Sequence, residues 1–270
     1  MVILEILDAE IPICAIMADQ QSGMFGQACF SDNSIKNTFG TAGVLTVNVG
    51  DKPRDVAGLT GSVAWKVKGQ VKYEIEGVVF HSGQTIQWLR DNLGIFAPAN
   101  RIDEIVTSLS NNGGVYLVPA LGGLAAPYWD RKTRASIQGL GLDSSSAHLV
   151  RAAVEAMAFQ TLDIIEKLKD FPVDTFKVDG GASSSNFLCQ FLADITGLRI
   201  QRPFELERTA LGTAYIAGLK VGIWRDLEEI SKSWTAEKVF EPSIKESDRE
   251  RLVTGWKEAV NRTLTGSGKK

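Results

Sequence analysis

An acidic residue directly after an apolar run is the first candidate for chemistry in this chain. Asp19 follows the run Ile11–Ala18, which is rich in β-branched residues, and Gln20 and Gln21 come next. The run has the length and composition of a buried strand, and the carboxyl ends of strands are where open α/β sheets bind their ligands. Asp19 is therefore a candidate catalytic carboxylate, although an acid in this place is more often a cap or a turn residue.

A turn rich in glycine and threonine follows shortly downstream. Residues 36–43 and the alternating segment Val44–Val49 are predicted to form two strands joined by a tight turn that contains Gly40 and Thr41. Bare backbone N–H groups and a hydroxyl suit phosphate oxygens. A carboxylate that faces such a turn is the arrangement needed for transfer of a phosphoryl group to a hydroxyl.

A glycine pair, Gly180 and Gly181, lies between a predicted strand at Thr175–Val178 and a predicted helix at 184–196. Glycine lets a ligand approach the backbone, and a helix N-terminus favours anions and polar nucleotide edges. A tight turn between strand and helix would need the same glycines, so the pair alone does not decide between the two interpretations.

Bulk composition excludes several classes of function. The chain has 270 residues, 44% hydrophobic and 23% charged, which suits one large globular domain or one and a half. A net charge of −3 gives no sign of a nucleic-acid or membrane surface, and no apolar run reaches membrane-spanning length. Three scattered cysteines and two histidines predict reduced thiols in a cytoplasmic protein, with no disulfide framework and no metal site. The N-terminus has no basic region leading into a signal peptide, so none is expected.

Periodicity predicts the elements that position these residues. A hairpin is expected at 63–75, further strands at 115–118 and 199–201, and helices at 83–92, 101–109, 146–169, 210–221 and 245–263. On the longest helix an apolar stripe is expected to face the core, with Arg151 and Glu155 on the opposite face. Residues 266–270 are expected to be disordered.

The order of short motifs is far more specific than any single spacing. The sequence resembles the FGGY carbohydrate kinase family, and within it the glycerol kinases, in unbroken order over nearly the whole chain. The matching segments are Ala18–Gln21, Lys36–Thr41, Glu76–Phe80, Gly83–Asp91, Ala126–Asp130, Ala135–Leu140, Val178–Ala182 and Thr209–Tyr215.

The resemblance implies an α/β fold, an actin-like ATPase (ribonuclease H-like) domain with a mixed sheet flanked by helices. Residues 1–30 would contain the last strand and helix of the N-terminal kinase domain with the catalytic Asp. Residues 31–265 would form the nucleotide-binding C-terminal domain. The implied reaction is ATP-dependent phosphorylation of glycerol, or a related polyol or sugar, to the 3-phosphate.

The resemblance also assigns roles to residues. Asp19 corresponds to the general base and also to a substrate contact. Gln20 corresponds to a contact with a substrate hydroxyl. Six positions correspond to contacts with the nucleotide: Gly40, Thr41, Gly83, Gln87, Gly181 and Ser185. The cofactors implied are ATP and Mg²⁺, with the ion held mainly by phosphates and water rather than by this chain.

Departures from the family pattern limit what is implied. Ala18, Ala42 and Val44 differ from the usual glycerol kinase residues, and Ser185 stands where the family more often has Asn. Only the C-terminal half of a two-domain kinase is matched, so the phosphate loop and the polyol-gripping residues of the first domain have no counterpart. We therefore expect the isolated chain to be incomplete for catalysis. The alternative is a non-catalytic half-kinase that binds a nucleotide or a partner, and the sequence leaves a homo-oligomer open.

Overall fold

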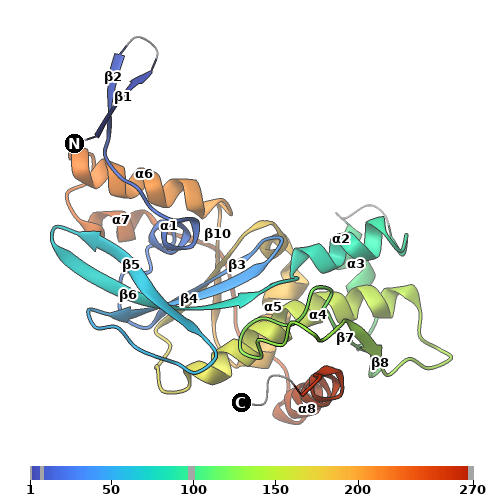
Figure 1. Cartoon of the computed structure of the whole chain (residues 1–270). Coiled ribbons are helices and arrows are strands. Elements are labelled where there is room, and N and C mark those ends of the chain that lie inside the picture. The colour runs from blue at the N-terminus through green and yellow to red at the C-terminus, as the bar shows by residue number, and fades with distance from the viewer. Residues whose placement is uncertain (1, 7–8, 97–100, 267–270) are drawn as a thin grey trace.

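A seven-stranded mixed sheet forms the centre of the molecule (Figure 1). The computed structural model describes residues 2–6, 9–96 and 101–266, with side chains from residue 11 onward. Neighbouring strands follow the order β11-β10-β9-β3-β4-β6-β5, in which β3, β9 and β10 are parallel and the other neighbours are antiparallel. The strands are β3 (Ser34–Phe39), β4 (Gly43–Gly50), β5 (Thr60–Val67), β6 (Gln70–Val79), β9 (Thr175–Asp179), β10 (Ile200–Pro203) and β11 (Ala236–Phe240).

The two predicted hairpins are confirmed. Strands β3 and β4 are joined by the turn 40–42, and β5 and β6 are joined by the two residues Lys68 and Gly69. Both of these residues have positive φ, +49° and +85°. That backbone twist matches the right-handed twist of the flanking strands, which explains why so short a loop suffices.

Helices cover both faces of the sheet (Figure 1). On one face lie α2, α3, α4, α5 and α8, over a large core that includes Phe39, Leu45 and Phe176. On the other face lie α1, α6 and α7, over a smaller core that includes Phe25, Trp65 and Tyr215. The helices are α1 (Asp19–Gly26), α2 (Gly83–Asp91), α3 (Ile102–Thr107), α4 (Ser146–Ile165), α5 (Asn186–Thr196), α6 (Arg208–Val221), α7 (Leu227–Ser233) and α8 (Glu246–Thr263).

Apart from the strand over Ile11–Ala18, the predicted helices and strands are found, with boundaries shifted by a few residues. Three elements escaped the sequence patterns: α7, β11 and the short strand β8 (Ser136–Gln138), which pairs with β7 (Tyr116–Val118) in a small separate sheet. Of the tail expected to be disordered, residues 267–270 lie outside the described part of the chain. No helix of that described part is long and apolar enough to cross a membrane.

The prediction that Glu155 lies on the solvent face of α4 is wrong. Glu155 is only 1% exposed, because neighbouring elements enclose almost the whole of α4. Arg151 donates from Nε to the Glu155 carboxylate at 2.7 Å, and its NH1 group donates to the carbonyl oxygen of Leu109 at 2.6 Å. This ion pair compensates the buried charge of Glu155, which the amphipathic pattern predicts on the solvent face.

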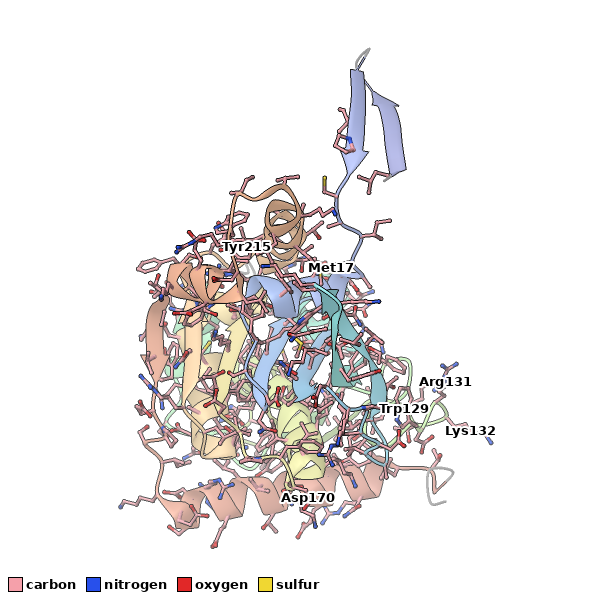
Figure 2. All side chains as sticks on the ribbon, turned by 90° about the vertical axis from the view of Figure 1, so that its left-hand side faces the viewer. Met17, Trp129, Arg131, Lys132, Asp170 and Tyr215 are labelled. Atoms are coloured by element: carbon pink, nitrogen blue, oxygen red, sulfur yellow. The ribbon has the colours of Figure 1, made fainter. Side chains whose placement is uncertain are left out.

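The prediction of one buried strand over Ile11–Ala18 is also wrong. Strand β2 (Ala9–Ile13) pairs only with β1 (Val2–Ile6), and residues 14–18 have no regular structure. Ile11 is 43% exposed and Ile16 is 83% exposed, because this hairpin stands away from the rest of the molecule (Figure 2). The chain rejoins the body at Met17, which packs against the smaller core beside Tyr215 (Figure 2).

Helix α1 begins directly at Asp19 and packs closely against α6. A Cβ atom on Gly212 would lie 1.8 Å from the carbonyl oxygen of Ser22, so the two backbones touch. The Ser22 hydroxyl donates to the carbonyl oxygen of Thr209 at 2.6 Å, which fixes the register of the two helices. Helix α6 therefore determines where the candidate carboxylate at the start of α1 lies.

This contact predicts that Gly212→Ala destabilises the protein, although alanine is the better helix former. The added methyl group must push α1 away from α6, and overpacking of this kind costs about 1–3 kcal/mol. The measurement is the midpoint of urea unfolding. Gly181→Ala is the matched control, because a Cβ there meets no atom within 4 Å. Equal midpoints for the two variants would contradict the prediction.

Candidate nucleotide site

One cavity of about 610 Å³ brings together all six residues predicted to contact a nucleotide. These residues come from the β3–β4 turn, the first two turns of α2 and the segment between β9 and α5. They are Gly40, Thr41, Gly83, Gln87, Gly181 and Ser185. Helix α4 closes the cavity with Val154 and Met157.

The turn between β3 and β4 is held by the N-terminus of α2. Gly83 donates its N–H to the carbonyl oxygen of Gly40 at 3.0 Å, and the N–H groups of Ser82 and Gln84 both donate to the carbonyl oxygen of Thr41 at 3.1 and 3.2 Å. A Cβ on Gly83 would lie 2.7 Å from the Gly40 oxygen, so glycine is needed for this close approach. The turn thus satisfies N–H groups that a helix start otherwise leaves unpaired.

The expectation of bare N–H groups in this turn is wrong at Gly40. Its N–H donates to the carbonyl oxygen of Ala42 at 3.0 Å. Thr41 is different, because it is exposed and, within residues 9–96 and 101–266, neither its N–H nor its hydroxyl has a hydrogen-bond partner. Thr41 is therefore the residue of this turn with donors left for an anion.

The opposite wall of the cavity is the segment between β9 and α5. Gly180 has a φ of +81°, and a Cβ there would lie 2.7 Å from the carbonyl oxygen of Phe39, which brings the segment against the end of β3. Gly181 begins a short 3-10 helix (η3, Gly181–Ser184), and a Cβ on it would meet no atom within 4 Å. The Gly181 backbone therefore faces open space in the cavity.

The hydroxyl of Ser185 is hydrogen-bonded to other residues of the protein. The oxygen accepts from the N–H of Leu188 at 3.0 Å as the cap of α5, and the hydroxyl donates to the carboxylate of Asp103. The contact predicted between Ser185 and the nucleotide stays a prediction, and the Ser185 hydroxyl already donates its hydrogen bond to Asp103.

The two residues predicted to contact the substrate lie outside the lining of this cavity. Asp19 is exposed and accepts from the N–H of Gln20 at 2.8 Å, and the buried Lys36 donates to Gln20 Oε1 and to Thr38 Oγ1, both at 2.7 Å. Lys36 and Thr38 share one side of β3, and Gly40 follows directly after the strand ends at Phe39, about 13 Å from Lys36 along the chain. A chain of hydrogen bonds thus leads from Asp19 through Gln20 and Lys36 to β3, the strand that ends at the β3–β4 turn.

Comparison with known proteins identifies the family. Residues 35–221 match the C-terminal domain of the FGGY family of carbohydrate kinases. The chain belongs to that family. It is 47% identical over 264 residues to glycerol kinase 2 of Thermotoga maritima and 44% identical over 261 residues to glycerol kinase of Alkaliphilus metalliredigens, covering 96% and 95% of this chain but 53% and 52% of those proteins. The chain thus spans about half the length of these relatives.

Solved structures confirm the predicted fold class. Glycerol kinase of Plasmodium falciparum with ADP superposes with a TM-score of 0.84 at 33% identity, over 91% of this chain and 50% of that one. A ligand-bound xylulose kinase of Lactobacillus acidophilus gives a TM-score of 0.83 at 24% identity, over 97% and 53% of the two chains, and shows the fold alone. The mixed sheet flanked by helices is that of an actin-like ATPase domain.

Sequence patterns missed a buried polar cluster beside α1 of this FGGY domain. Burial lowers the pKa of Lys36, whereas the neighbouring carboxylates of Asp179 and Glu74 act in the opposite direction. Burial raises the pKa of Glu74 to about 7, although its Oε1 atom accepts from Ser62 at 3.0 Å and from Gln21 at 2.5 Å. A lysine inside a buried strand was the available signal, since such a charge requires partners.

Other residues missed by the sequence patterns line the cavity itself. Asp103 contributes a carboxylate, and Arg90 contributes a guanidinium group that is paired with Asp91 through bonds of 2.6 and 2.8 Å. Ile86 and Ala182 add to an apolar surface suited to a flat base. Among the described residues, no group of three or more His, Cys, Asp or Glu side chains is placed to hold a metal ion.

The cluster predicts that Lys36→Met raises the pKa of Glu74 further above its value of about 7, because the ammonium charge of Lys36 lowers that pKa. Protonation of Glu74 would then persist to higher pH. The measurement is a carboxyl-carbon NMR titration from pH 4 to pH 9. Lys220→Met, at the exposed end of α6, is the control and should leave the titration unchanged. An unchanged or lowered pKa in Lys36→Met would show that the ammonium does not act on this carboxyl.

Proposed function

We propose that this chain is the nucleotide-binding half of an ATP-dependent kinase that phosphorylates a hydroxyl of glycerol or a related polyol. The observation that carries the proposal is the gathering of Gly40, Thr41, Gly83, Gln87, Gly181 and Ser185 around one cavity. The printed names of the relatives, glycerol kinases at 44–47% identity, support this choice of reaction. The glycerol kinase solved with ADP supports the choice of nucleotide.

The proposed arrangement of the nucleotide follows from the chemistry of the lining. The phosphates lie at Thr41, where a hydroxyl and an N–H are free, and the base lies against the Gly181 backbone between the apolar side chains of Ile86 and Met157. Mg²⁺ would be held by the phosphates and water, and the described residues offer no group of three or more His, Cys, Asp or Glu side chains for it.

In the proposed reaction Asp19 takes the proton from the attacking hydroxyl and Gln20 orients that hydroxyl. Lys36 holds the Gln20 side chain through its oxygen at 2.7 Å, so the amide is fixed before substrate binds. Phosphoryl transfer depends mainly on positioning and charge stabilisation, and a carboxylate that orients the nucleophile fits that requirement.

The proposed partner is an N-terminal kinase domain of the kind that completes the relatives, of which this chain matches only 52–53%. In this proposal residues 31–265 form the nucleotide-binding domain and residues 1–30 are the last strand and helix of the N-terminal domain, with the helix α1 packed against α6 of the nucleotide-binding domain. The proposed enzyme is cytoplasmic. The alternative is a half-kinase that binds a nucleotide or a partner without catalysis.

Nucleotide binding is tested with Gly181→Val. The isolated chain should bind ADP with a dissociation constant on the order of 10⁻⁴–10⁻³ M, because only part of the full set of contacts is present. A Cβ at 181 meets no protein atom within 4 Å, so Gly181→Val should fold normally and yet place its side chain in the space of the base. We expect ADP affinity to fall at least about tenfold by amide NMR titration.

The control for this experiment is Ser231→Val on the exposed side of α7, across the sheet from the cavity. It should bind ADP as the wild type does. Equal ADP binding by Gly181→Val and wild type would remove the nucleotide from this cavity. A folded wild type that binds no ADP would overturn the proposed function.

The role of Asp19 is tested in a kinase that contains this chain together with an N-terminal domain. Asp19→Asn keeps the size of the side chain and removes the base, so kcat should fall by roughly 10²–10⁴ while ADP affinity stays the same. A coupled assay of ADP release measures kcat, and Asp51→Asn on the exposed loop after β4 is the control. Loss of nucleotide binding with kcat retained would assign Asp19 a different role.

A further inference from the structure

We propose that Asp103 recognises the base, accepting a hydrogen bond from the exocyclic amino group of adenine. The inference rests on the proposed nucleotide site and adds a specificity-determining residue to it. Asp103 is the second residue of α3, lines the cavity and came from no sequence motif.

The Asp103 carboxylate is held in place by the start of α5. One oxygen accepts from the Ser185 hydroxyl, and the other accepts from the N–H of Asn186 at 2.9 Å. A carboxylate oxygen can accept two hydrogen bonds, so each oxygen keeps capacity for a ligand. The side chain is therefore oriented before binding, which lowers the entropy cost of a further contact.

The length of the two cavity walls places Asp103 at a distance from the β3–β4 turn. On one wall, Gly180 touches Phe39 at the end of β3, and Ser185 follows five residues later, roughly 10 Å away at the 3-10 rise. On the other wall, α2 runs from Gly83, bonded to Gly40, to Arg90 over about 10 Å. Thr41 and the Asp103–Ser185 pair thus lie toward opposite ends of the site.

Charge sets the direction in which a nucleotide lies between these ends. A carboxylate repels phosphate groups, so the phosphates belong at Thr41 and the base at Asp103. The nearby cation Arg90 does not neutralise this carboxylate, because its Nε and NH2 groups are bonded to Asp91 at 2.6 and 2.8 Å. Ser185 cannot donate a hydrogen bond to the base while its hydroxyl donates to Asp103.

A carboxylate is only an acceptor, which selects among base edges. Adenine offers the hydrogens of its 6-amino group. Purine lacks that group, and hypoxanthine would place a carbonyl oxygen against the carboxylate. Hydrogen bonds to charged groups are stronger than those between neutral groups, so their loss is measurable even in a weak complex.

The experiment compares ADP with purine riboside 5′-diphosphate and inosine 5′-diphosphate by amide NMR titration of the whole chain. The wild type should bind ADP roughly tenfold or more tightly than the purine analogue, with the inosine nucleotide weakest. In Asp103→Leu, which is similar in size and has no acceptor, the first two ligands should bind about equally. In Asp103→Asn, whose acceptor is uncharged, the ratio should fall between these limits.

Glu104→Gln is the matched control, since it removes a carboxylate one residue away that is paired with Arg101 at 2.8 Å. It should keep the wild-type ratio. If Asp103 only caps α5, its variants would weaken all three ligands alike, and an unchanged ratio in a folded variant overturns the inference. Equal binding of ADP and purine analogue by the wild type overturns the inference alone, whereas no ADP binding by the folded wild type overturns the proposed function as well.

Discussion

The close approach of three backbone segments around the end of β3 is the constraint on which the candidate site depends. The start of α2 contacts the turn through the bond from Gly83 to Gly40, and the segment after β9 contacts Phe39 through Gly180. A side chain at Gly83 or Gly180 would place a carbon 2.7 Å from a carbonyl oxygen. Backbone carbonyls cannot move aside as side chains do, so the two walls of the cavity have their spacing fixed by glycine.

A buried ammonium group links β3 to α1, the helix on the other face of the sheet. Lys36 lies on β3, the strand that ends at the phosphate-side turn, and its side chain reaches Gln20 on α1. Its two hydrogen-bond partners, Gln20 and Thr38, are both neutral, so its charge is balanced through space by Asp179 and Glu74. Removing one member of such a cluster leaves an uncompensated buried charge, which couples the position of α1 to the strand.

Much of this arrangement could be predicted from the sequence because it depends on local chemistry. The β3–β4 turn and the glycines of the opposite wall are specified by residues adjacent in the chain, and the family resemblance placed Gln87 beside them. Glu155 was misplaced because amphipathic patterns assume that one helix face meets water, whereas helices distant in sequence enclose α4. Asp103 was missed because its place in the cavity depends on a hydrogen bond with Ser185, 82 residues away.

The cavity is better equipped to bind a nucleotide than to transfer a phosphoryl group. Among the described residues that line it, Arg90 is the one cation, and Asp91 pairs with it. Phosphoryl transfer requires positive charge around the transferred group. In the proposed reaction that charge would come from Mg²⁺ or from residues beyond this lining. The candidate base, Asp19, is at the start of α1. This helix lies on the other face of the sheet from α2, α3 and α4, whose residues line the cavity. In the proposed kinase a second domain that closes over both would supply this charge and exclude water, and the chain matches only 53% of the first of its glycerol kinase relatives.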